Sequence, residues 1–486
     1  MAFIKRFVSL CCAAMLCAAV SGSALAAEPM EIENSPLAAG FLHSAIVRDD
    51  GTLLVAGSNT YGQLGVTLGG TEEAVISSEI DPHDSSENEP ENSPAESGKG
   101  SSAPSGTSMD FIPVMENVKA VYAGYLNTFA IDADGILYGW GWNEGSQLGL
   151  GDTENYTAPA EILSGVVSVA TGRFHTAAVS HDGTLWVWGW NSRGQLGNGS
   201  TSDLNLPKEM LDNVRSAAAG MEHTMAVKQD NTLWAAGNND YGQLADGGTE
   251  DSMVFRQVME DVQDVACTAF GTAVLKTDGS VWVCGYNANG ELGNGGTQNI
   301  NVPMQILSDV EKVVCGENFS AAIKRDGTLY AWGSNSYGQY GEETSAKPLK
   351  VAENVTDVAL GGGHMLYLTE DGVVYALGNN EQGQLGNGTL DAHTEPASVA
   401  ENVTPSPKRE SNAPIVALVV VLIVAVLAVF GILIARTVKG KPGKGGVKKP
   451  KPESEKKPVQ KVQAASSKKP EVDVEALGDE ITKEEE

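Results

Sequence analysis

The sequence predicts an all-β fold, a seven-bladed β-propeller, followed by one transmembrane α-helix and a disordered tail. Three observations predict it. A Gly-Gln-Leu-Gly element or a close variant occurs seven times, mostly at intervals of 48 residues. A hairpin with an Asp-Gly turn accompanies most copies. One uncharged apolar stretch, Ile415 to Ala435, lies near the C-terminus.

The first 26 residues have the pattern of a signal peptide. Lys5 and Arg6 precede an apolar run over residues 7–20, and small residues ending in Ala26 follow. A short basic start, an apolar stretch of this length and a small-residue cleavage site are typical of secretion signals. We therefore expect residues 1–26 to be removed and the folded part to be exported.

The repeat occupies residues 37–404. Its elements begin at Gly62, Ser146, Gly194, Gly242, Gly290, Gly338 and Gly383. The first two copies are separated by one period plus an insertion. Small antiparallel sheets cannot bury both faces alone, but they cover one another when they stack radially. An open β-solenoid is the alternative, and the long period favours the closed propeller.

Each unit repeats one order of strands. A short strand ends in Ala-Gly, a second begins at His-Thr, and an Asp-Gly turn leads to a third strand. Such turns in tight hairpins need a positive φ at both central residues. A last short strand is expected after Pro207, Pro303 or Pro396. Recurrent tryptophans of the third strand are expected in the core between blades: Trp186, Trp234 and Trp282.

The motif Ala-Gly-x-x-His-Thr followed by Asp-Gly-x-x-Trp-x-Trp-Gly-x-Asn-x-x-Gly-Gln-Leu-Gly resembles the regulator of chromosome condensation repeat, a family of seven-bladed propellers. Departures are local, since Gly271 and Phe319 replace a histidine and Ala245 replaces a glycine. The resemblance implies a binding scaffold. It also implies that the recurrent histidines each make a structural hydrogen bond within their blade: His43, His175, His223 and His364.

The insertion in the first unit covers about residues 66–110. It is acidic, rich in Ser, Glu, Pro and Gly, and almost free of large apolar residues. Such a segment buries too little apolar surface to offset its ordering entropy, so we expect it to be disordered.

Residues 405–413 form a polar stalk and 414–435 the transmembrane helix, because 21 uncharged residues in a helix span about 30 Å. The tail, 436–486, is predicted to be disordered and cytoplasmic, since Lys and Arg dominate it up to Lys469. We expect its basic part to contact anionic lipid. The predicted location is therefore the cell membrane, single-pass, with the propeller outside, and the simple anchor suggests a bacterium.

The charge of the chain excludes some partners. The formal net charge is −30, and many of the basic residues lie in the tail, so the propeller itself is strongly acidic. Binding of nucleic acid through phosphate contacts is therefore not expected. The nuclear GTPase that the best-known family member acts on is not expected either, because this propeller is exported. Basic protein surfaces would be attracted.

No catalytic motif is present. The chain has no nucleophile elbow, zinc-protease motif or phosphate-binding loop, so we expect no enzyme activity, metal or cofactor. The four recurrent histidines would be spread around a ring instead of converging on one ion. Three cysteines lie outside the signal, Cys267, Cys284 and Cys315, and permit at most one internal disulfide.

Aromatic residues decorate the turns at one end of the blades. We expect these turns to lie opposite the Asp-Gly turns and to form a partner-binding surface made of Phe41, Tyr61, Tyr125, Trp142, Trp190, Tyr241, Tyr286 and Tyr337. The position of Trp142 and Trp190 accepts Ser or Asn in other units, which indicates exposure to water. A rim of Trp and Tyr suits an extracellular protein partner. A carbohydrate or cell-wall ligand is the alternative, packing of the rings between loops is another, and a propeller enzyme is the remote one.

Overall fold

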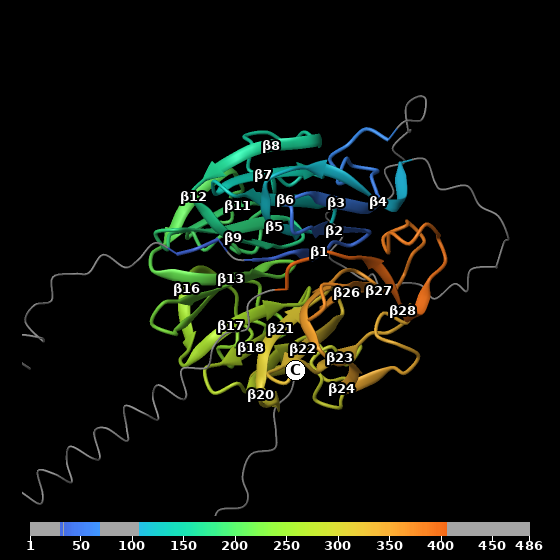
Figure 1. Cartoon of the computed structure of the whole chain (residues 1–486). Coiled ribbons are helices and arrows are strands. Elements are labelled where there is room, and N and C mark those ends of the chain that lie inside the picture. The colour runs from blue at the N-terminus through green and yellow to red at the C-terminus, as the bar shows by residue number, and fades with distance from the viewer. Residues whose placement is uncertain (1–29, 33, 69–105, 406–486) are drawn as a thin grey trace, which may run out of the picture. The chain divides into compact units, whose positions relative to one another are not determined.

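The computed structural model describes residues 30–32, 34–68 and 106–405, and this part is a propeller of seven four-stranded antiparallel sheets (Figure 1). The predicted signal peptide, transmembrane helix and tail lie outside the described residues, as does nearly all of the stalk. Within the part that is described, no helix has the length and apolarity needed to cross a membrane.

Each blade consists of four strands that are consecutive in the sequence and in the sheet. Blade 1 has β1 (Leu37–Ala39), β2 (His43–Val47), β3 (Leu53–Ser58) and β4 (Thr107–Met115). Blade 2 has β5 (Val118–Ala123), β6 (Asn127–Asp132), β7 (Ile136–Gly141) and β8 (Tyr156–Ser164). Blade 3 has β9 (Val166–Thr171), β10 (His175–Ser180), β11 (Leu185–Gly189) and β12 (Leu204–Leu211). Blade 4 has β13 (Val214–Ala219), β14 (His223–Lys228), β15 (Leu233–Gly237) and β16 (Ser252–Met259).

The remaining blades follow the same plan. Blade 5 has β17 (Val262–Cys267), β18 (Gly271–Lys276), β19 (Val281–Gly285) and β20 (Ile300–Leu307). Blade 6 has β21 (Val310–Cys315), β22 (Phe319–Lys324), β23 (Leu329–Gly333) and β24 (Ser345–Ala352). Blade 7 has β25 (Val355–Leu360), β26 (His364–Thr369), β27 (Val374–Gly378) and β28 (His393–Ala400). The predicted all-β, seven-bladed architecture is confirmed.

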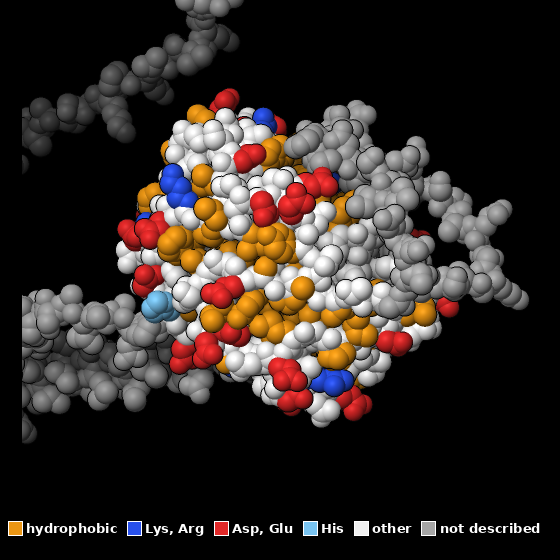
Figure 2. All heavy atoms as spheres, turned by 90° about the horizontal axis from the view of Figure 1, so that it is seen from above, with side chains coloured by type: hydrophobic (Ala, Val, Ile, Leu, Met, Phe, Trp, Pro, Cys, Tyr) orange, Lys and Arg blue, Asp and Glu red, His pale blue; other side chains and the backbone are white. Residues whose placement is uncertain are grey.

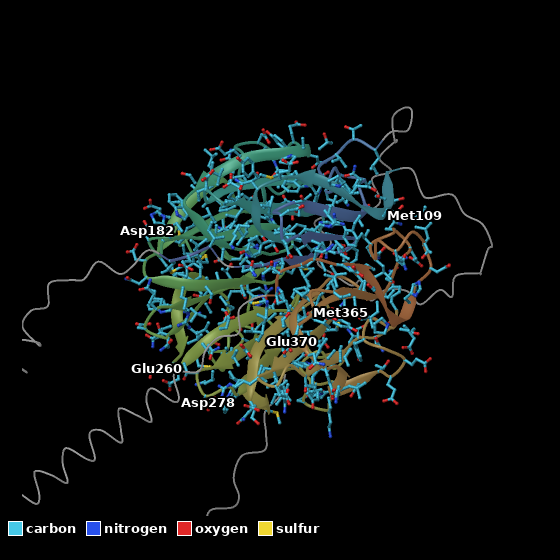
Figure 3. All side chains as sticks on the ribbon, in the orientation of Figure 1. Met109, Asp182, Glu260, Asp278, Met365 and Glu370 are labelled. Atoms are coloured by element: carbon cyan, nitrogen blue, oxygen red, sulfur yellow. The ribbon has the colours of Figure 1, made fainter. Side chains whose placement is uncertain are left out.

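The Asp-Gly turns join the second and third strands, as expected, but with a different conformation. Gly51 has a φ of 79°, whereas Asp50 does not have a positive φ. The Gly51 amide donates to the Arg48 carbonyl (2.9 Å), and the Asp50 carboxylate accepts from the Thr52 amide (3.0 Å). Only the glycine therefore needs the left-handed conformation, as in a hairpin with a bulge. Figure 3 places the turn residues Asp182 and Asp278 at the outside of the molecule and Met365 in its interior.

The core lies between neighbouring sheets, and Trp186, Trp234 and Trp282 pack against it as predicted, although other tryptophans are its fully buried members. Trp140, Trp188 and Trp332 are fully buried, one position before the glycine that ends the third strand. Each indole donates a hydrogen bond to a backbone carbonyl of the preceding blade; Trp188 Nε1, for example, lies 2.8 Å from the Gln147 oxygen. Trp186, Trp234 and Trp282 are only half-buried. They sit two residues earlier in the third strand, closer to the Asp-Gly turn. There the Lys228 ammonium lies 4.5 Å from the Trp234 ring centroid.

The recurrent histidines link neighbouring blades, which corrects the expectation of bonds within one blade. The Nε2 atom of His175 lies 2.8 Å from the Thr224 hydroxyl in blade 4. That hydroxyl donates to the Gln195 carbonyl, so its proton is already used and the imidazole must be the donor. His43 and His223 make the same bond to Thr128 and Thr272.

The ring closes by face-to-face packing of blades 1 and 7, and the termini share no sheet. His364 of blade 7 contacts the Ser44 hydroxyl of blade 1 (2.8 Å), and this hydroxyl donates to the Gln384 carbonyl (2.6 Å). The Asp49 amide donates to the Asn402 carbonyl (3.0 Å). The seam therefore repeats the histidine–hydroxyl–carbonyl link found between other blades.

Two predicted boundaries were wrong at the outer strands. Pro207, Pro303 and Pro396 lie inside β12, β20 and β28 instead of preceding them. A proline is tolerated there because the outer strand is an edge, where a missing N–H interrupts no ladder. Residues 107–110 of the predicted insertion belong to β4.

On the side of the molecule seen in Figure 2, acidic side chains surround apolar patches and Lys and Arg are few.

Candidate functional site

The loops that join strands one and two, and strands three and four, lie at one end of the propeller because each blade is an antiparallel meander. We call this end the rim face. The Asp-Gly turns lie at the opposite end, as the sequence predicts. The rim face carries the aromatic residues that the sequence singled out.

Blades 1 to 3 bring six aromatic rings into one group, which we call the rim cluster: Phe41, Tyr61, Tyr125, Trp142, Phe174 and Trp190. Phe41 and Tyr125 are stacked with centroids 4.3 Å apart. Trp142 lies 6.3 Å from Tyr61, 6.4 Å from Tyr125 and 5.6 Å from Phe174. Phe174 contacts Trp190 edge-on at 4.9 Å. Offset and edge contacts of this kind are the favoured aromatic geometries.

The expectation that Trp142 is exposed to water was wrong, since it is only 4% exposed. It packs with Leu126, Phe174 and Met221 beneath the more exposed rings. The inference failed because this repeat position is buried even where it is polar: Ser58, Asn238 and Asn379 are 2%, 3% and 6% exposed. Trp142 therefore supports the cluster, while Phe41, Tyr61, Tyr125 and Trp190 are half-buried and present ring surface to solvent.

The other three predicted residues do not join this cluster directly. Tyr241 and Tyr286 contact each other at 5.0 Å and share Phe270 as a neighbour. Tyr337 is 39% exposed on blade 6. A Cβ atom at Gly363 would lie 2.6 Å from the Tyr337 ring, so the ring rests against that glycine's backbone.

Arg173 is the cation of the rim cluster. Its guanidinium carbon lies 4.3 Å from the Tyr125 ring centroid and 5.1 Å from that of Phe174. One Nη contacts the Tyr125 hydroxyl at 3.5 Å. Among the ion pairs of the described residues none involves Arg173, and its buried Nε has no hydrogen-bond partner there.

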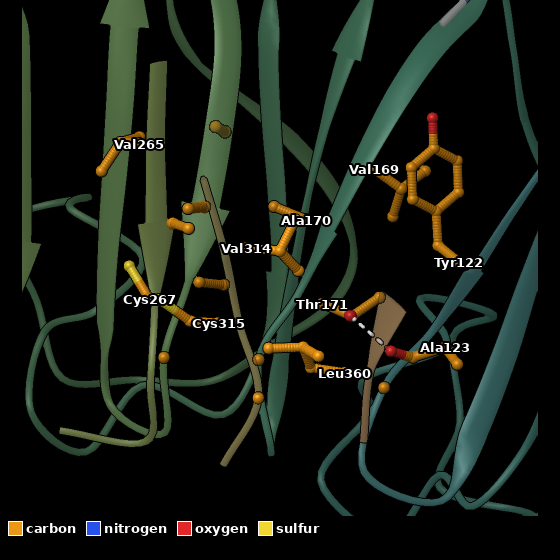
Figure 4. Close-up of a pocket in the computed structure, with 18 of the residues that line it drawn as sticks. Tyr122, Ala123, Val169, Ala170, Thr171, Val265, Cys267, Val314, Cys315 and Leu360 are labelled. Carbon is orange, nitrogen blue, oxygen red and sulfur yellow. Dashed lines mark hydrogen bonds between the residues drawn. The ribbon is translucent and has the colours of Figure 1, made fainter. Parts of the chain in front are cut away.

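A cavity of about 650 Å³ runs along the propeller axis and reaches the rim face. The inner strands supply its walls, which include Val169, Val265, Val314 and Leu360. Figure 4 shows these walls, together with the hydrogen bond from the Thr171 hydroxyl to the Ala123 carbonyl (3.0 Å). Small and apolar side chains thus surround most of the space.

The sequence permits at most one disulfide among the three cysteines of the propeller. Cys284 is buried, whereas Cys267 and Cys315 are half-buried and line the cavity from adjacent inner strands (Figure 4). All three are free thiols. Burial raises the pKa of the Cys284 and Cys315 thiols to about 12, so they remain protonated at neutral pH.

Glu317 stands at the mouth of this cavity on blade 6. Burial raises the pKa of its carboxyl group to about 7, and the charge of Arg173 opposes that rise. At the other end, the charged groups that line the cavity have partners. Arg215 donates to the Val262 carbonyl (3.0 Å), and Lys312 pairs with Asp357 of the next blade.

Sequence analysis missed Arg173, Phe174, Phe270 and Glu317. A signal for them existed, because they occupy the two variable positions of the Ala-Gly-x-x-His loop, which also hold Phe41 and Tyr125. Each of the two positions changes its residue type from unit to unit, so the repeat pattern did not draw attention to these four residues. Their convergence on the axis depends on closure of the ring.

Comparisons with known proteins place this architecture in context. A sequence profile of the RCC1-like domain matches residues 166–411, and profiles of the regulator of chromosome condensation (RCC1) repeat match residues 37–63, 118–147 and 134–179. The ultraviolet-B receptor UVR8 of Arabidopsis thaliana is 32% identical over 128 residues, which cover 26% of this chain and 22% of the receptor. The match thus spans a small part of the receptor's length.

Solved structures of similar fold include human WBSCR16, with a TM-score of 0.59 and 22% identity over 72% of this chain and 94% of that one. Prp20p from Saccharomyces cerevisiae also gives 0.59, with 18% identity over 76% and 88%. The yeast RCC1 (Prp20) structure with Kap60 bound gives 0.58, with 17% identity over 77% and 86%. At these identities the likeness shows the fold alone.

Proposed function

Because the chain belongs to the RCC1-like domain family, we propose that it is a protein-binding scaffold whose rim face recognises the partner. The observation that carries the proposal is the rim cluster, in which half-buried aromatic rings and one arginine gather on a single end of the propeller. Binding, and not catalysis, is the role we assign. Prp20p, a structural relative, is described with its binding to Gsp1p and histones, which supports protein recognition by this fold.

The physical argument rests on what the cluster offers a partner. Interface residues that dominate binding energy are most often Trp, Tyr and Arg, held in place and shielded from water when the complex forms. Here the buried Trp142 and Phe174 hold Trp190 and Tyr125 in fixed positions, so little side-chain freedom is lost on binding. The acidic propeller favours a partner with a basic surface around the contact.

We further propose that this scaffold is displayed outside a bacterial cell. The signal-like residues 1–26 support export, and the uncharged residues 414–435 followed by a basic tail support a single membrane anchor with the tail inside. Contact of the basic tail with anionic lipid would add to the anchoring.

Substitution of Trp190 by alanine is expected to weaken capture of the partner at least about tenfold, because loss of a central aromatic residue commonly has this effect. The purified full chain is immobilised and incubated with cell-surface and culture extracts. The amount of partner protein that it retains is then measured. Trp190 is preferred to Trp142, whose loss would damage the packing beneath the cluster.

The matched control is Trp186→Ala. Trp186 belongs to the same blade and is also half-buried, but its indole bonds to Ser180 beside the Asp-Gly turn, at the opposite end of the propeller. The control should retain the partner. Equal retention by both variants would show that the rim face is not the binding surface, and retention of glycan alone would favour the carbohydrate reading.

A further inference from the structure

The mouth of the axial cavity is formed by one residue from each blade. These residues follow the glycine, or Thr268, that comes directly after each inner strand: Phe41, Tyr125, Arg173, Met221, Ala269, Glu317 and Gly362. Backbone hydrogen bonds join several of them, including Phe41 N to Tyr125 O (3.0 Å) and Ala269 N to Glu317 O (3.1 Å). These hydrogen bonds connect the backbone around the mouth and fix the positions from which its side chains project.

This ring carries one positive and one negative side chain. Arg173 comes from blade 3 and Glu317 from blade 6, and both are half-buried. They attract each other electrostatically, yet no ion pair within 4.0 Å involves either residue in the described part of the chain. Two half-buried opposite charges that face one space without contact leave room for a ligand between them.

The orientation of Arg173 suits a carboxylate. Tyr125 and Phe174 lie against its guanidinium group, one Nη contacts the Tyr125 hydroxyl, and the buried Nε has no acceptor in the described residues. Guanidinium and carboxylate groups match in geometry and form paired hydrogen bonds. The Glu317 carboxylate is the complementary group for an ammonium ion.

Below the mouth the cavity is mostly apolar. Val265, Val314 and Leu360 line it (Figure 4). At the far end, Ser216 donates to the Asp264 carboxylate (3.0 Å), and Arg215 and Lys312 have the partners described above. Arg215, Lys312 and Asp264 of that end thus have polar partners, whereas neither Arg173 nor Glu317 forms an ion pair in the described residues.

Two N-terminal residues line the far end. The Met30 amide donates to the His181 carbonyl of blade 3 (2.9 Å), and the Ser35 carbonyl accepts from Val121 of blade 2 (3.0 Å). Met30 and Glu31 line the cavity. These residues narrow the far end beside blades 2 and 3, and the rim face is the entrance that we assign to a ligand.

We propose that the axial cavity binds a small zwitterion with an apolar side chain, an amino acid or short peptide, whose carboxylate contacts Arg173 and whose ammonium group contacts Glu317. The apolar side chain lies in the cavity below. A volume of about 650 Å³ falls within the range of small-molecule sites and accommodates either size of ligand. This site shares Phe41, Tyr125 and Arg173 with the rim cluster, whereas Tyr61 and Trp190 lie outside it.

Titration calorimetry of the purified full chain at pH 8 tests the proposal with L-leucine and L-leucyl-L-leucine as probes. Each probe is compared with its N-acetylated and its C-amidated form, which lack the ammonium or the carboxylate group. We expect millimolar or tighter binding of at least one unmodified probe, and at least about tenfold weaker binding of both blocked forms. The variants Arg173→Gln and Glu317→Gln should each weaken the unmodified probe to a similar extent.

Arg193→Gln is the matched control. Arg193 lies on the same face, but it already pairs with Asp240 and Asp251 and does not line the cavity. This variant should bind the probe as the wild type does, and circular dichroism should show all variants folded. Absence of binding at 10 mM, equal binding of the blocked forms, or unchanged binding by folded Arg173→Gln would overturn the proposal.

Discussion

Replacement of His175 by asparagine is expected to reduce the loss of stability between pH 8 and pH 5 by about 2 kcal/mol. Burial, together with the charge of His223, lowers the pKa of His175 from 6.5 to about 3. In the unfolded chain the imidazole regains its ordinary pKa. Below pH 6.5 the unfolded state therefore binds a proton at His175 that the folded state does not bind. The free energy of unfolding falls as the pH drops from 6.5 toward the pKa of His175 in the folded state.

The structural reason is that a second ring proton has no acceptor. His175 Nε2 already donates to Thr224, and its buried Nδ1 has no partner in the described residues. His43, His223 and His364 have pKa values lowered by burial to about 4, 4 and 3. If their effects add, the four histidines together lower the free energy of unfolding at pH 5 by about 8 kcal/mol.

Urea unfolding of the full chain at pH 8, 6.5 and 5 measures this effect. Asparagine is suitable because blade 2 has Asn127 at the same position. The control is His181→Asn, which alters an exposed histidine in the Asp-Gly turn of the same blade. An acid sensitivity of His175→Asn equal to that of the wild type would contradict the assignment of the buried, neutral ring.

Glu291→Gln is expected to stabilise the protein by about 3 kcal/mol at pH 8 and by less than about 1 kcal/mol at pH 5. Glu291 is 2% exposed, and burial raises the pKa of its carboxyl group from 4.5 to about 7. Folding therefore favours the neutral acid, so the wild type loses stability as the pH rises from 4.5 through 7. Glutamine does not ionise and avoids this loss.

The repeat itself indicates that glutamine fits. The other six units have glutamine at this position, and its Oε1 accepts the amide two residues earlier, as Gln195 does from Arg193 (3.0 Å). Glu291 Oε2 accepts the Asn289 amide in the same way (2.8 Å). The reverse change, Gln195→Glu, should destabilise blade 3 by a similar amount at pH 8. A stability gain that does not change with pH would show that desolvation of the carboxylate is not its cause.

Much of the fold was predictable because a repeated pattern averages out local exceptions. Blade number, strand order and the two ends of the blades follow from the period and from the Asp-Gly turns. The residues of the blade contacts were harder to assign. Trp186 and Trp188 are two residues apart and lie on the same face of the strand, so a tryptophan at either position fits the pattern. Only the packing of the neighbouring blade distinguishes the buried Trp188 from the half-buried Trp186.

One exception could have been interpreted from sequence alone. In blades 3 and 4 the histidine ring lies against the glycine of Ala-Gly, where a Cβ atom at Gly172 would come within 2.7 Å of His175. Blade 5 has Gly271 in place of the histidine and Thr268 in place of the glycine. The two changes compensate for each other in volume, because the Thr268 side chain occupies space beside Gly271. A Cβ atom at Gly271 would lie 2.7 Å from the Thr268 hydroxyl. By contrast, the placement of Arg173 from blade 3 and Glu317 from blade 6 at one mouth is not revealed by any local pattern.

Because the ring closes without exchanging a strand, each blade is complete within one continuous stretch of the chain, which is about 48 residues long in every blade except blade 1 with its insertion. The seam between blades 7 and 1 uses the same hydroxyl link as other blade junctions. Duplication or loss of a whole unit in the gene would leave every remaining sheet intact and supply the same complementary faces on both sides of the break. The number of blades, and with it the width of the axial cavity, is thus open to change in evolution by a single genetic event.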